Sequence, residues 1–369
     1  MLDSVCHLTS VHIPDDVRIY QKEARSLAKA GYEVTLVAPA LKEAALEGVR
    51  WHRLPRPHSR LDRFWRIVAA AYRAALASGA KVVHIHDPEL LFVGLALKLQ
   101  GRKVVWDAHE DLPRQVMSKY WLPRPLRRPV AWVAGVFVRA ITRTFDAIVA
   151  ATPAIAKSFP PHKTVVVQNY PLLSEFSSLE RIPYGERPNR VVYVGGITAI
   201  RGAMEMVRAM EYLPQDLKAR FVLAGSFSPP ELEQAVRSLK GWRHVDFLGW
   251  RDRKSVSAIL ASSRVGVVVF YPEPNHMEAQ PNKLFEYMAA GIPVVASNFP
   301  RWREIIEGAG CGLMVDPLDP RAIADAIQWL LVHPKEAEEM GKRGREAVLE
   351  KYNWDKEAEK LLNMYRRLS

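Results

Sequence analysis

The sequence has only two cysteines among 369 residues, Cys6 and Cys311, which lie far apart and lack metal-type spacing. This scarcity argues against a disulfide framework or a zinc site, and it fits a reducing, cytoplasmic compartment. The N-terminal segment MLDSVCHLTSVHIPDD has no basic start and no long apolar core, so we expect no signal peptide. The longest apolar runs, such as Val130–Val138, are too short to span a bilayer.

Several binding motifs are missing as well. No strand-like segment is followed by a GxGxxG pattern, which counts against a nicotinamide or flavin oxidoreductase, and the chain has no P-loop pattern. Zinc-finger, KH and RRM signatures are also absent, so we do not expect nucleic acid as a partner.

Positive charge is concentrated in the first half of the chain, which has a formal net charge of +12. Residues 1–170 hold 25 Lys and Arg against 14 Asp and Glu, whereas the remaining residues hold 27 against 26. We therefore expect the first half to meet an anionic partner, either an anionic membrane surface or an anionic acceptor.

Short apolar segments alternate with helical periodicity along the chain, a pattern typical of parallel, doubly wound α/β sheets. Because 369 residues exceed one typical core, we predict two Rossmann-like domains, at 1–170 and 190–352. A proline-rich linker is expected at 171–189, and an amphipathic closing helix at 353–369, with a return of that helix to the first domain as one option. Strands are predicted at 5–11, 33–39, 79–89, 102–111, 146–153, 164–171, 190–196, 220–226, 244–250, 265–272 and 292–297, and helices at 17–30, 61–78, 320–332 and 334–351.

The stretch Glu278–Pro300 gives the strongest functional signal. Seven residues separate Glu278 from Glu286, and a helix is predicted from Pro281 until Gly291 ends it. Unpaired N–H groups at the start of such a helix suit phosphate oxygens, and Glu286, one turn deeper, suits sugar hydroxyls. Strand-like runs on both sides place these groups where open α/β sheets bind ligands. The alternative is an ordinary core helix, since acid pairs at this spacing are frequent.

Other candidates follow the predicted strands. His84, His86 and Asp87 follow one strand, and the two histidines share a face, but no further ligand group has convincing spacing, so we expect no metal. His109 lies beside two acids at another strand exit, where a structural and a functional histidine are both open interpretations. Arg201 follows a glycine turn, so it is either a phosphate contact or a solvated surface charge.

Two basic-aromatic segments occur in the first half. Residues 61–78 are predicted to form an amphipathic helix with arginines on one side and apolar residues on the other: Arg63, Arg66 and Arg73 against Trp65, Val68, Tyr72 and Leu76. The segment KYWLPRPLRRP (119–129) leads into the apolar run VAWVAGVFV. Two interpretations remain: the apolar sides face the domain core, or the segments bind anionic lipid.

Several motifs together resemble those of a known family. VGG followed by Arg201 and Gly202, then VLAG, VDFLGW and the Glu278-x7-Glu286 pair followed by AAGIPVVAS, are similar to the retaining glycosyltransferases of group one, family four. The segments HIPDDVRIYQKEARSLAKAGYEV, HIHDPEL and WDAHEDLP resemble bacterial members that build cell-surface polysaccharides or glycoconjugates. The resemblance covers almost the whole chain, and it implies a GT-B fold, in which two doubly wound domains face a cleft.

The resemblance implies a catalytic role for four residues, namely His109, Glu278, Arg201 and Lys283. Arg201 and Lys283 would neutralise the donor diphosphate, Glu278 would contact the donor sugar, and His109 would touch that sugar near the reacting carbon. Two cations at the departing diphosphate fit the charge that develops there during glycosyl transfer.

The resemblance also implies donor-binding and acceptor-side residues. Glu286 would bind the ribose hydroxyls, and backbone groups would hold the base. The donor-binding candidates are Gly195, Gly196, Gly249, Trp250, Arg251, Asn282, Leu284 and Glu286, and the acceptor-side candidates are Asp16, Arg18, Asp87 and Glu110. The chain departs from the family twice: Gly196 stands where many members have arginine, and Pro14-Asp15-Asp16 replaces a glycine pair.

We therefore predict a retaining glycosyltransferase that moves a sugar from a nucleotide-diphosphate sugar to a lipid-linked or polysaccharide acceptor. No metal or other cofactor is expected, since the chain has no Asp-x-Asp triplet. A cytoplasmic location is expected, with peripheral attachment to the inner face of the membrane as an option. The alternatives are a nucleotide-sugar epimerase or phosphorylase of the same fold, and a non-catalytic protein that binds a sugar nucleotide or a glycan.

Overall fold

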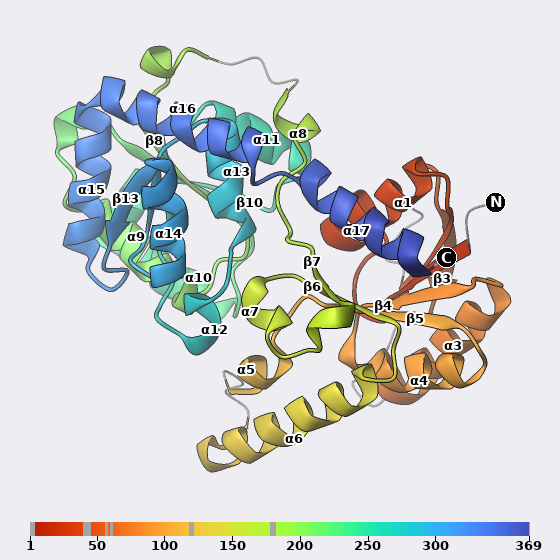
Figure 1. Cartoon of the computed structure of the whole chain (residues 1–369). Helices are drawn as coiled ribbons and strands as arrows, with labels where there is room; N and C mark the ends of the chain where they lie inside the picture. The colour runs from red at the N-terminus through yellow and green to blue at the C-terminus, as the bar shows by residue number, and fades with distance from the viewer. Residues whose placement is uncertain are drawn as a thin grey trace. The chain divides into compact units, whose positions relative to one another are not determined.

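The computed structural model of the chain describes residues 4–39, 46–55, 58–59, 62–117, 122–177 and 182–368. Contacts divide the chain into two compact units. The first consists of Met1–Asn169 with Trp354–Ser369, and the second of Tyr170–Asn353. Each unit is built around one parallel sheet with helices packed on it (Figure 1). The predicted fold class, two doubly wound α/β domains, is confirmed.

The first unit contains a seven-stranded sheet within the residues that the structure describes, with the order β3-β2-β1-β4-β5-β6-β7. Its strands are β1 (Ser4–Leu8), β2 (Glu33–Pro39), β3 (Arg50–Leu54), β4 (Val82–Ile85), β5 (Lys103–Ala108), β6 (Ala147–Ala150) and β7 (Thr164–Val166). The strand order reverses between β1 and β4. The loops that follow these two strands therefore meet at the switch point where open α/β sheets bind ligands.

The two faces of this sheet differ in chemistry, because successive side chains along a strand point to opposite faces. Cys6, Leu8 and Ile85 contribute to an apolar core that also includes residues of α3 (Val68–Ala77), α4 (Leu91–Leu99) and α6 (Arg124–Thr142). The opposite face carries His7 of β1 and His84 of β4, which are direct neighbours in the parallel register. Against it pack η1 (Val17–Ala24), α1 (Arg25–Lys29) and α17 (Trp354–Leu368).

Helix α17 belongs to the core of the first unit although it follows the second unit in sequence (Figure 1). Its first residue, Trp354, donates an indole N–H to Ser26 Oγ at 2.9 Å. Leu361, Met364 and Tyr365, on its inner side, are buried. The remaining short elements of this unit are η2 (Arg63–Ile67), η3 (Pro88–Leu90), α5 (Leu112–Met117), α7 (Pro153–Ala156) and η4 (Pro161–Lys163).

The segment predicted as one amphipathic helix at 61–78 begins with a π-helical stretch, η2, before α3. A π-helix has more residues per turn than the α-helix, so the helical wheel drawn for 61–78 does not apply at its start. Trp65, which the wheel placed on the apolar side, is 79% exposed, whereas Ile67 and Ala71 are buried.

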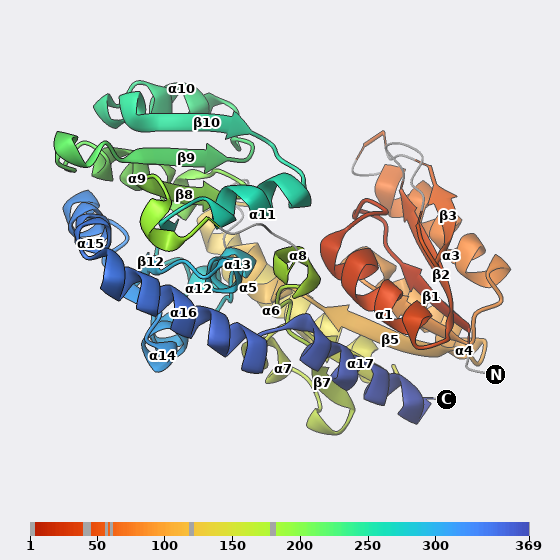
Figure 2. The same ribbon diagram turned by 90° about the horizontal axis from the view of Figure 1, so that it is seen from above.

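The second unit contains a six-stranded parallel sheet among the described residues, with the order β10-β9-β8-β11-β12-β13. Its strands are β8 (Arg190–Val194), β9 (Arg220–Ala224), β10 (Val245–Gly249), β11 (Val265–Val268), β12 (Val294–Ser297) and β13 (Gly312–Val315). Figure 2 shows β9 and β10 side by side, with α10 (Glu231–Arg237) next to them. The order reverses between β8 and β11, which places a second switch point beside the loops after these strands.

The helices of the second unit include the predicted one that opens after Pro281. They are α8 (Ser174–Ser177), η5 (Tyr184–Glu186), η6 (Ala199–Arg201), α9 (Ala203–Ala209), η7 (Gln215–Leu217), α10, η8 (Lys240–His244), α11 (Arg253–Ala261), α12 (Pro274–Met277), α13 (Asn282–Ala290), α14 (Pro300–Ala309), α15 (Pro320–Val332) and α16 (Pro334–Glu350). The elements α8 and η5, which lie in the segment expected as a linker, belong to this unit. Of the helices described, none is long and apolar enough to cross a membrane.

Candidate functional site

The candidate site in the second unit lies at the switch point between β8 and β11. The chain leaves β8 through Gly195, whose φ of +116° lies in a region that side chains other than glycine rarely adopt. A neighbouring loop passes very close, since a Cβ added to Gly225 would lie only 1.9 Å from the carbonyl oxygen of Gly195. These glycines therefore hold two loop backbones tightly together at the edge of the sheet.

Two cations converge on this glycine loop. Lys283, in the first turn of α13, is only 9% exposed, and its ammonium lies 4.9 Å from the ring centre of Tyr193 and 5.0 Å from that of Phe270. The guanidinium of Arg201 lies 5.7 Å from the same Phe270 ring and donates to the carbonyl oxygen of Gly196 at 3.2 Å. The structure thus brings the two residues expected at the diphosphate to one place.

The electrostatics of this pair favour an anion. Burial, and then the positive charge of Arg201, lower the pKa of Lys283 to about 7, although Glu286 acts in the opposite direction. Within the described residues, neither Arg201 nor Lys283 forms an ion pair with a carboxylate. An anion placed between the two cations would relieve their repulsion and would interact strongly, because the site is largely shielded from water.

Glu286 is buried in the middle of α13, where Arg253 of α11 donates to its Oε1 at 2.7 Å. Arg253 also pairs with Glu175 of α8, and these interactions raise the pKa of Arg253 despite its burial. One oxygen of Glu286 is therefore engaged inside the protein. Sequence reasoning missed Arg253, since an arginine at the start of a helix carries no signal of its own.

The other donor-side candidates differ in exposure. Glu278, directly after α12, and Asn282, at the start of α13, are exposed. Leu284 is a core residue, and its backbone N–H donates to the carbonyl oxygen of Pro281 at 3.1 Å. The amide of Leu284, one of the donor-binding candidates, therefore already has a partner, whereas those of Asn282 and Lys283 precede the first backbone bond of the helix.

The loop expected to hold the base follows β10. Gly249 has a φ of +66°, and its carbonyl oxygen accepts from the N–H of Gly225 at 2.8 Å, which ties this loop to the one near Gly195. Trp250 is 71% exposed, and Arg251 beside it is exposed as well. The two side chains therefore face solvent in this structure, and the backbone of the loop is the part that is fixed.

His276 of α12 is a residue that sequence reasoning missed. It is buried, its Nδ1 lies 3.1 Å from the carbonyl oxygen of Tyr271, and its ring centre is 5.0 Å from that of Phe270. Burial lowers the pKa of His276, and Arg201 and Lys283 add to this effect, while the bond to Tyr271 opposes it. His276, Arg201 and Lys283 all lie beside the ring of Phe270, and no sequence pattern predicts this position of the histidine.

A second group of polar side chains lies at the switch point of the first unit. His12, after β1, has its Nδ1 3.3 Å from Asp16 Oδ2 and its Nε2 3.5 Å from Asp87 Oδ1, after β4. His109, after β5, packs edge-on against His12 with ring centres 5.3 Å apart. The structure therefore brings together His109 and two of the acceptor-side candidates, Asp16 and Asp87, with His12 as an addition that the sequence did not suggest.

Both histidines in this group are biased toward the protonated form. Burial alone would lower the pKa of His12, but its hydrogen bond to Asp16 and the charge of Asp87 raise it to about 9. Burial also opposes protonation of His109, yet the carboxylate of Asp107, 3.5 Å from His109 Nδ1, raises the pKa of His109. The site thus offers imidazolium groups suited to an anionic or hydroxyl-bearing substrate.

The two other acceptor-side candidates have side-chain partners outside this group. Arg18 is buried: its guanidinium donates twice to Asp107, at 2.9 and 2.7 Å, and its Nε lies 3.1 Å from Glu23 Oε1. It therefore serves an internal ion-pair network. Glu110 is exposed, and its carboxylate is bonded to the side chain of Gln115.

Two family models match the chain, one in each unit. Residues 18–169 match the model described as glycosyl transferase 4-like domain, and residues 188–333 match the one described as glycosyl transferases group 1. Together the two matches cover most of the chain.

Relatives with known names are moderately similar. An uncharacterized glycosyltransferase, MJ1607 of Methanocaldococcus jannaschii, is 30% identical over 177 residues, which are 48% of this chain and 44% of the relative. The alpha-maltose-1-phosphate synthase of Mycolicibacterium smegmatis is 27% identical over 323 residues, 79% of this chain and 80% of the relative. The chain thus spans less than half of the length of the first of these relatives and most of the second.

Solved structures share the fold over the full length. The sucrose-phosphate synthase of Thermosynechococcus elongatus has a TM-score of 0.79 at 22% identity, with 99% of both chains covered. Anabaena Alr3699/HepE, in complex with UDP-glucose, has a TM-score of 0.75 at 13% identity, with 99% of this chain and 100% of that chain covered. At such identities the similarity establishes the arrangement of helices and strands.

Proposed function

Because the chain carries a glycosyl transferase 4-like domain followed by a group 1 glycosyltransferase domain, we propose that it transfers a sugar from a nucleotide-diphosphate sugar to an acceptor. The observation that carries this proposal is that Arg201 and Lys283 lie beside the same aromatic ring, Phe270, at the switch point of the second unit. In glycosyl transfer, negative charge builds on the departing diphosphate while the sugar gains cationic character. Two fixed cations beside a helix start suit the stabilisation of that charge.

The proposal assigns the other donor-side residues by what they offer. Glu286 has one oxygen on Arg253 and a second available for a ribose hydroxyl. Glu278, which is exposed after α12, is assigned to the donor sugar, and the loop Gly249–Arg251 to the base. A complex with UDP-glucose in the structurally similar Anabaena protein supports a nucleotide sugar as the donor.

His109 and the acceptor-side group of the first unit complete the proposed machinery. We assign His109 to the reacting sugar, and Asp16 and Asp87 to acceptor hydroxyls, with His12 held between the two carboxylates. Retention of the anomeric configuration and metal-independent transfer are part of the proposal, and both derive from the resemblance to the group one family. The anomeric proton coupling of the product, read by NMR, tests retention.

We further propose that the acceptor is presented at an anionic membrane surface through α6. The outward side of this helix, the α6 apolar face, is unusually apolar for an exposed surface: Leu126, Val130, Trp132, Val133, Val136 and Phe137 are between 38 and 69% exposed. Phe92 of α4 extends the face, with its ring centre 5.1 Å from that of Phe137. Exposed arginines flank it at Arg124, Arg128 and Arg143. Apolar and cationic groups on one helix match an anionic lipid surface.

The helix predicted at 61–78, which was also expected to bind lipid, is less well suited to this role. Arg66 is bonded to Asp62 one turn away, at 2.6 and 2.7 Å, so its charge is partly neutralised. The side chain of Arg63 and residues 119–121 lie outside the described part of the chain. The lipid-binding interpretation therefore rests on α6.

A thermal-shift panel of nucleotide sugars tests the donor, since the preferred donor stabilises the native protein by mass action. The variants Arg201→Gln and Lys283→Gln should each weaken binding of the nucleoside diphosphate about 10- to 100-fold, the value of one hydrogen bond to a charged group. Arg208→Gln on α9 and Lys342→Gln on α16 are matched controls on exposed residues, and they should bind as the wild type does.

Turnover then separates the alternatives. A transferase releases nucleoside diphosphate when a glycolipid or glycan acceptor is added, and both site variants should lose this activity. An epimerase would convert the donor without any acceptor, and a binding protein would show no turnover. Unchanged nucleotide affinity in both site variants would contradict the proposed diphosphate site.

A further inference from the structure

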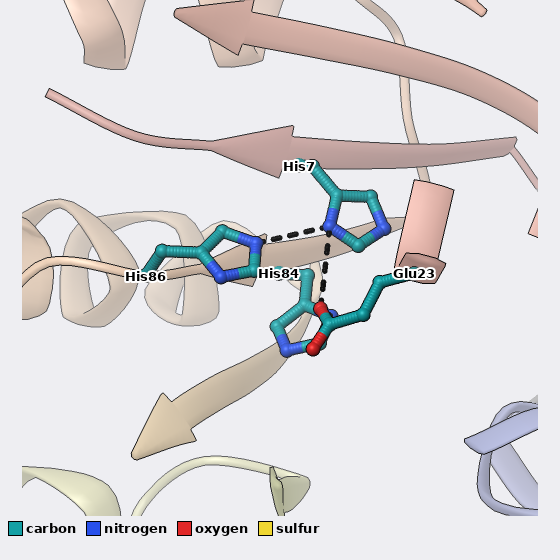
Figure 3. A group of neighbouring side chains, drawn as sticks. All are labelled: His7, Glu23, His84 and His86. Atoms are coloured by element: carbon teal, nitrogen blue, oxygen red, sulfur yellow. Dashed lines mark hydrogen bonds and ion pairs between the residues drawn. The ribbon is translucent and has the colours of Figure 1, made fainter. Parts of the chain in front are cut away.

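Four buried side chains come together on the polar face of the first sheet (Figure 3). They are His7 of β1, Glu23 of η1, His84 of β4 and His86 directly after β4. Each is completely buried. One ligand atom from each lies within 4.8 Å of the others. The group forms because the parallel register sets His7 beside His84, and His86 follows two residues later on the same face.

The distances within the group match a small coordination site. His7 Nδ1 lies 3.0 Å from His86 Nε2, and Glu23 Oε2 lies 3.9 Å from Nδ1 of both His7 and His84. Two ligands bound to one tetrahedral zinc at about 2.0–2.1 Å lie about 3.3–3.4 Å apart. These three distances differ from that spacing by about 0.3–0.6 Å, whereas the most widely separated ligand atoms, which lie within 4.8 Å of one another, would have to approach by up to about 1.4 Å.

Several polar atoms in the group have no hydrogen-bond partner. They are His7 Nε2, His84 Nε2 and both carboxylate oxygens of Glu23, although Oε1 has an ion pair with Arg18. The two unpartnered nitrogens are not the ones that approach Glu23, which are Nδ1 of each ring. Burying a polar group without a hydrogen-bond partner is costly, so such groups are rare in folded proteins. Three imidazoles and a carboxylate facing one point are also the ligand set that divalent transition metals prefer.

The surroundings provide the support that metal-binding histidines use. His86 Nδ1 lies 3.0 Å from Asp107 Oδ2, so this carboxylate orients the ring and leaves Nε2 facing the group. A carboxylate on the outer nitrogen is the common arrangement behind a metal-bound histidine. Tyr365 of α17 has its hydroxyl 2.9 Å from His84 Nδ1, the same nitrogen that lies 3.9 Å from Glu23, so an ion bound to this nitrogen would replace the contact with Tyr365.

The nearest cation does not occupy the centre of the group. Arg18 approaches Glu23 from the Oε1 side, at 3.1 Å, and is itself neutralised by Asp107. Glu23 Oε2, which faces the histidines, stays available. Burial raises the pKa of Glu23, and a bound divalent ion would favour its ionised form, so that one carboxylate and three neutral imidazoles would face the ion.

We propose that His7, Glu23, His84 and His86 bind a divalent transition-metal ion of the zinc type, which fixes η1 to the sheet of the first unit. This role departs from the expectation of no metal, but it is structural: the ion is enclosed in the first unit, and the proposed sugar transfer does not use it. The proposal does not depend on the proposed function, because nucleotide binding is assigned to the second unit.

Elemental analysis of the untagged full-length protein tests this proposal. Inductively coupled plasma mass spectrometry should find close to one equivalent of a transition metal, or one equivalent should bind after chelation and addition of zinc. Glu23→Gln keeps the shape of the side chain but removes the anionic ligand, and it should lower zinc affinity at least about tenfold. Glu205→Gln is the matched control, since Glu205 is a buried glutamate of the second unit that is bonded to Tyr271.

X-ray absorption on the wild-type protein provides a readout that does not depend on the stability of a variant. It should show nitrogen and oxygen ligands at about 2.0–2.1 Å with the outer-sphere scattering of imidazole. Two results would overturn the proposal. In the first, the wild-type protein contains no metal, and added zinc stabilises it no more than it stabilises Glu23→Gln. In the second, Glu23→Gln retains the full amount of metal. The first result would mean that the four side chains form only an internal hydrogen-bonded group. Nucleotide binding by Glu23→Gln should equal that of the wild type whatever the outcome.

Discussion

Lys283 shows how strongly one residue depends on its surroundings. Its ammonium is buried against two aromatic rings, and burial together with the positive charge of Arg201 lowers the pKa of this lysine to about 7. In the unfolded chain the lysine keeps its ordinary pKa. Between about pH 7 and the ordinary value of 10.5, the unfolded state therefore binds more protons, and the stability of the second unit should rise with pH over this window.

The lowered pKa of Lys283 also predicts that the protein takes up a proton at this lysine when it binds a nucleotide. At pH 8 most of the free protein has a neutral Lys283, and a diphosphate beside it restores the charged form. The affinity for a nucleoside diphosphate should therefore fall as the pH rises from 7 to 9. Calorimetric titration of UDP at pH 8 should give enthalpies that differ between buffers of different ionisation enthalpy, whereas Lys283→Arg, which is always charged, should show no such difference. Equal enthalpies for the wild type in all buffers would contradict this assignment.

At the residue scale, sequence reasoning selects groups that lie near each other in sequence or in a known pattern. Arg201 and Lys283 belong to such a pattern, and the structure sets both beside Phe270. The histidines at 84 and 86 share a face, as strand alternation predicts. Their neighbours His7 and Glu23 could not be foreseen, because only the register of β1 with β4 and the position of η1 bring them there.

At the scale of elements, the apolar strands are the predictable part. The prediction for β2, residues 33–39, coincides with the observed strand, and the other predicted strands are found with shorter bounds. The strand β3, RWHRL, was not predicted, because it lies at the edge of the sheet and three of its five residues are exposed. The π-helical turns of η1 and η2 were also not predicted, since a helical wheel assumes the α-helical period.

Helix α6 carries the prediction that belongs to this scale. If the α6 apolar face binds lipid, the double variant Trp132→Glu/Val133→Glu should lose most of its cosedimentation with vesicles that contain anionic lipid. Arg124→Gln and Arg128→Gln should each weaken binding about fivefold, which corresponds to about 1 kcal/mol per basic residue near the surface. Leu349→Glu on α16, an exposed leucine of the second unit, is the control. Equal sedimentation of all these variants would remove α6 from the membrane proposal.

The whole molecule consists of two units, and the first of them is not continuous in sequence: it combines residues 1–169 with residues 354–369. The first unit needs residues from both ends of the chain, because α17 packs on η1, α1 and β7. Periodicity predicts the two sheets and the last helix, but it does not decide which sheet that helix covers. The contacts that decide it are single side chains: Trp354 on Ser26, and Glu357, whose carboxylate accepts from the N–H of Gln168 at 2.9 Å.

Loss of packing in α17 should therefore destabilise the first unit and leave nucleotide binding by the second unit unchanged. Leu361→Ala removes a completely buried side chain and should lower the free energy of unfolding of the first unit by about 2–5 kcal/mol, measured by denaturant titration. Asn363→Ala, on the exposed side of the same helix, should change it little. UDP should still raise the melting temperature of the second unit in Leu361→Ala. If Leu361→Ala lowered the stability of the second unit as much as that of the first, α17 would support both units. The two units would then unfold as one cooperative body.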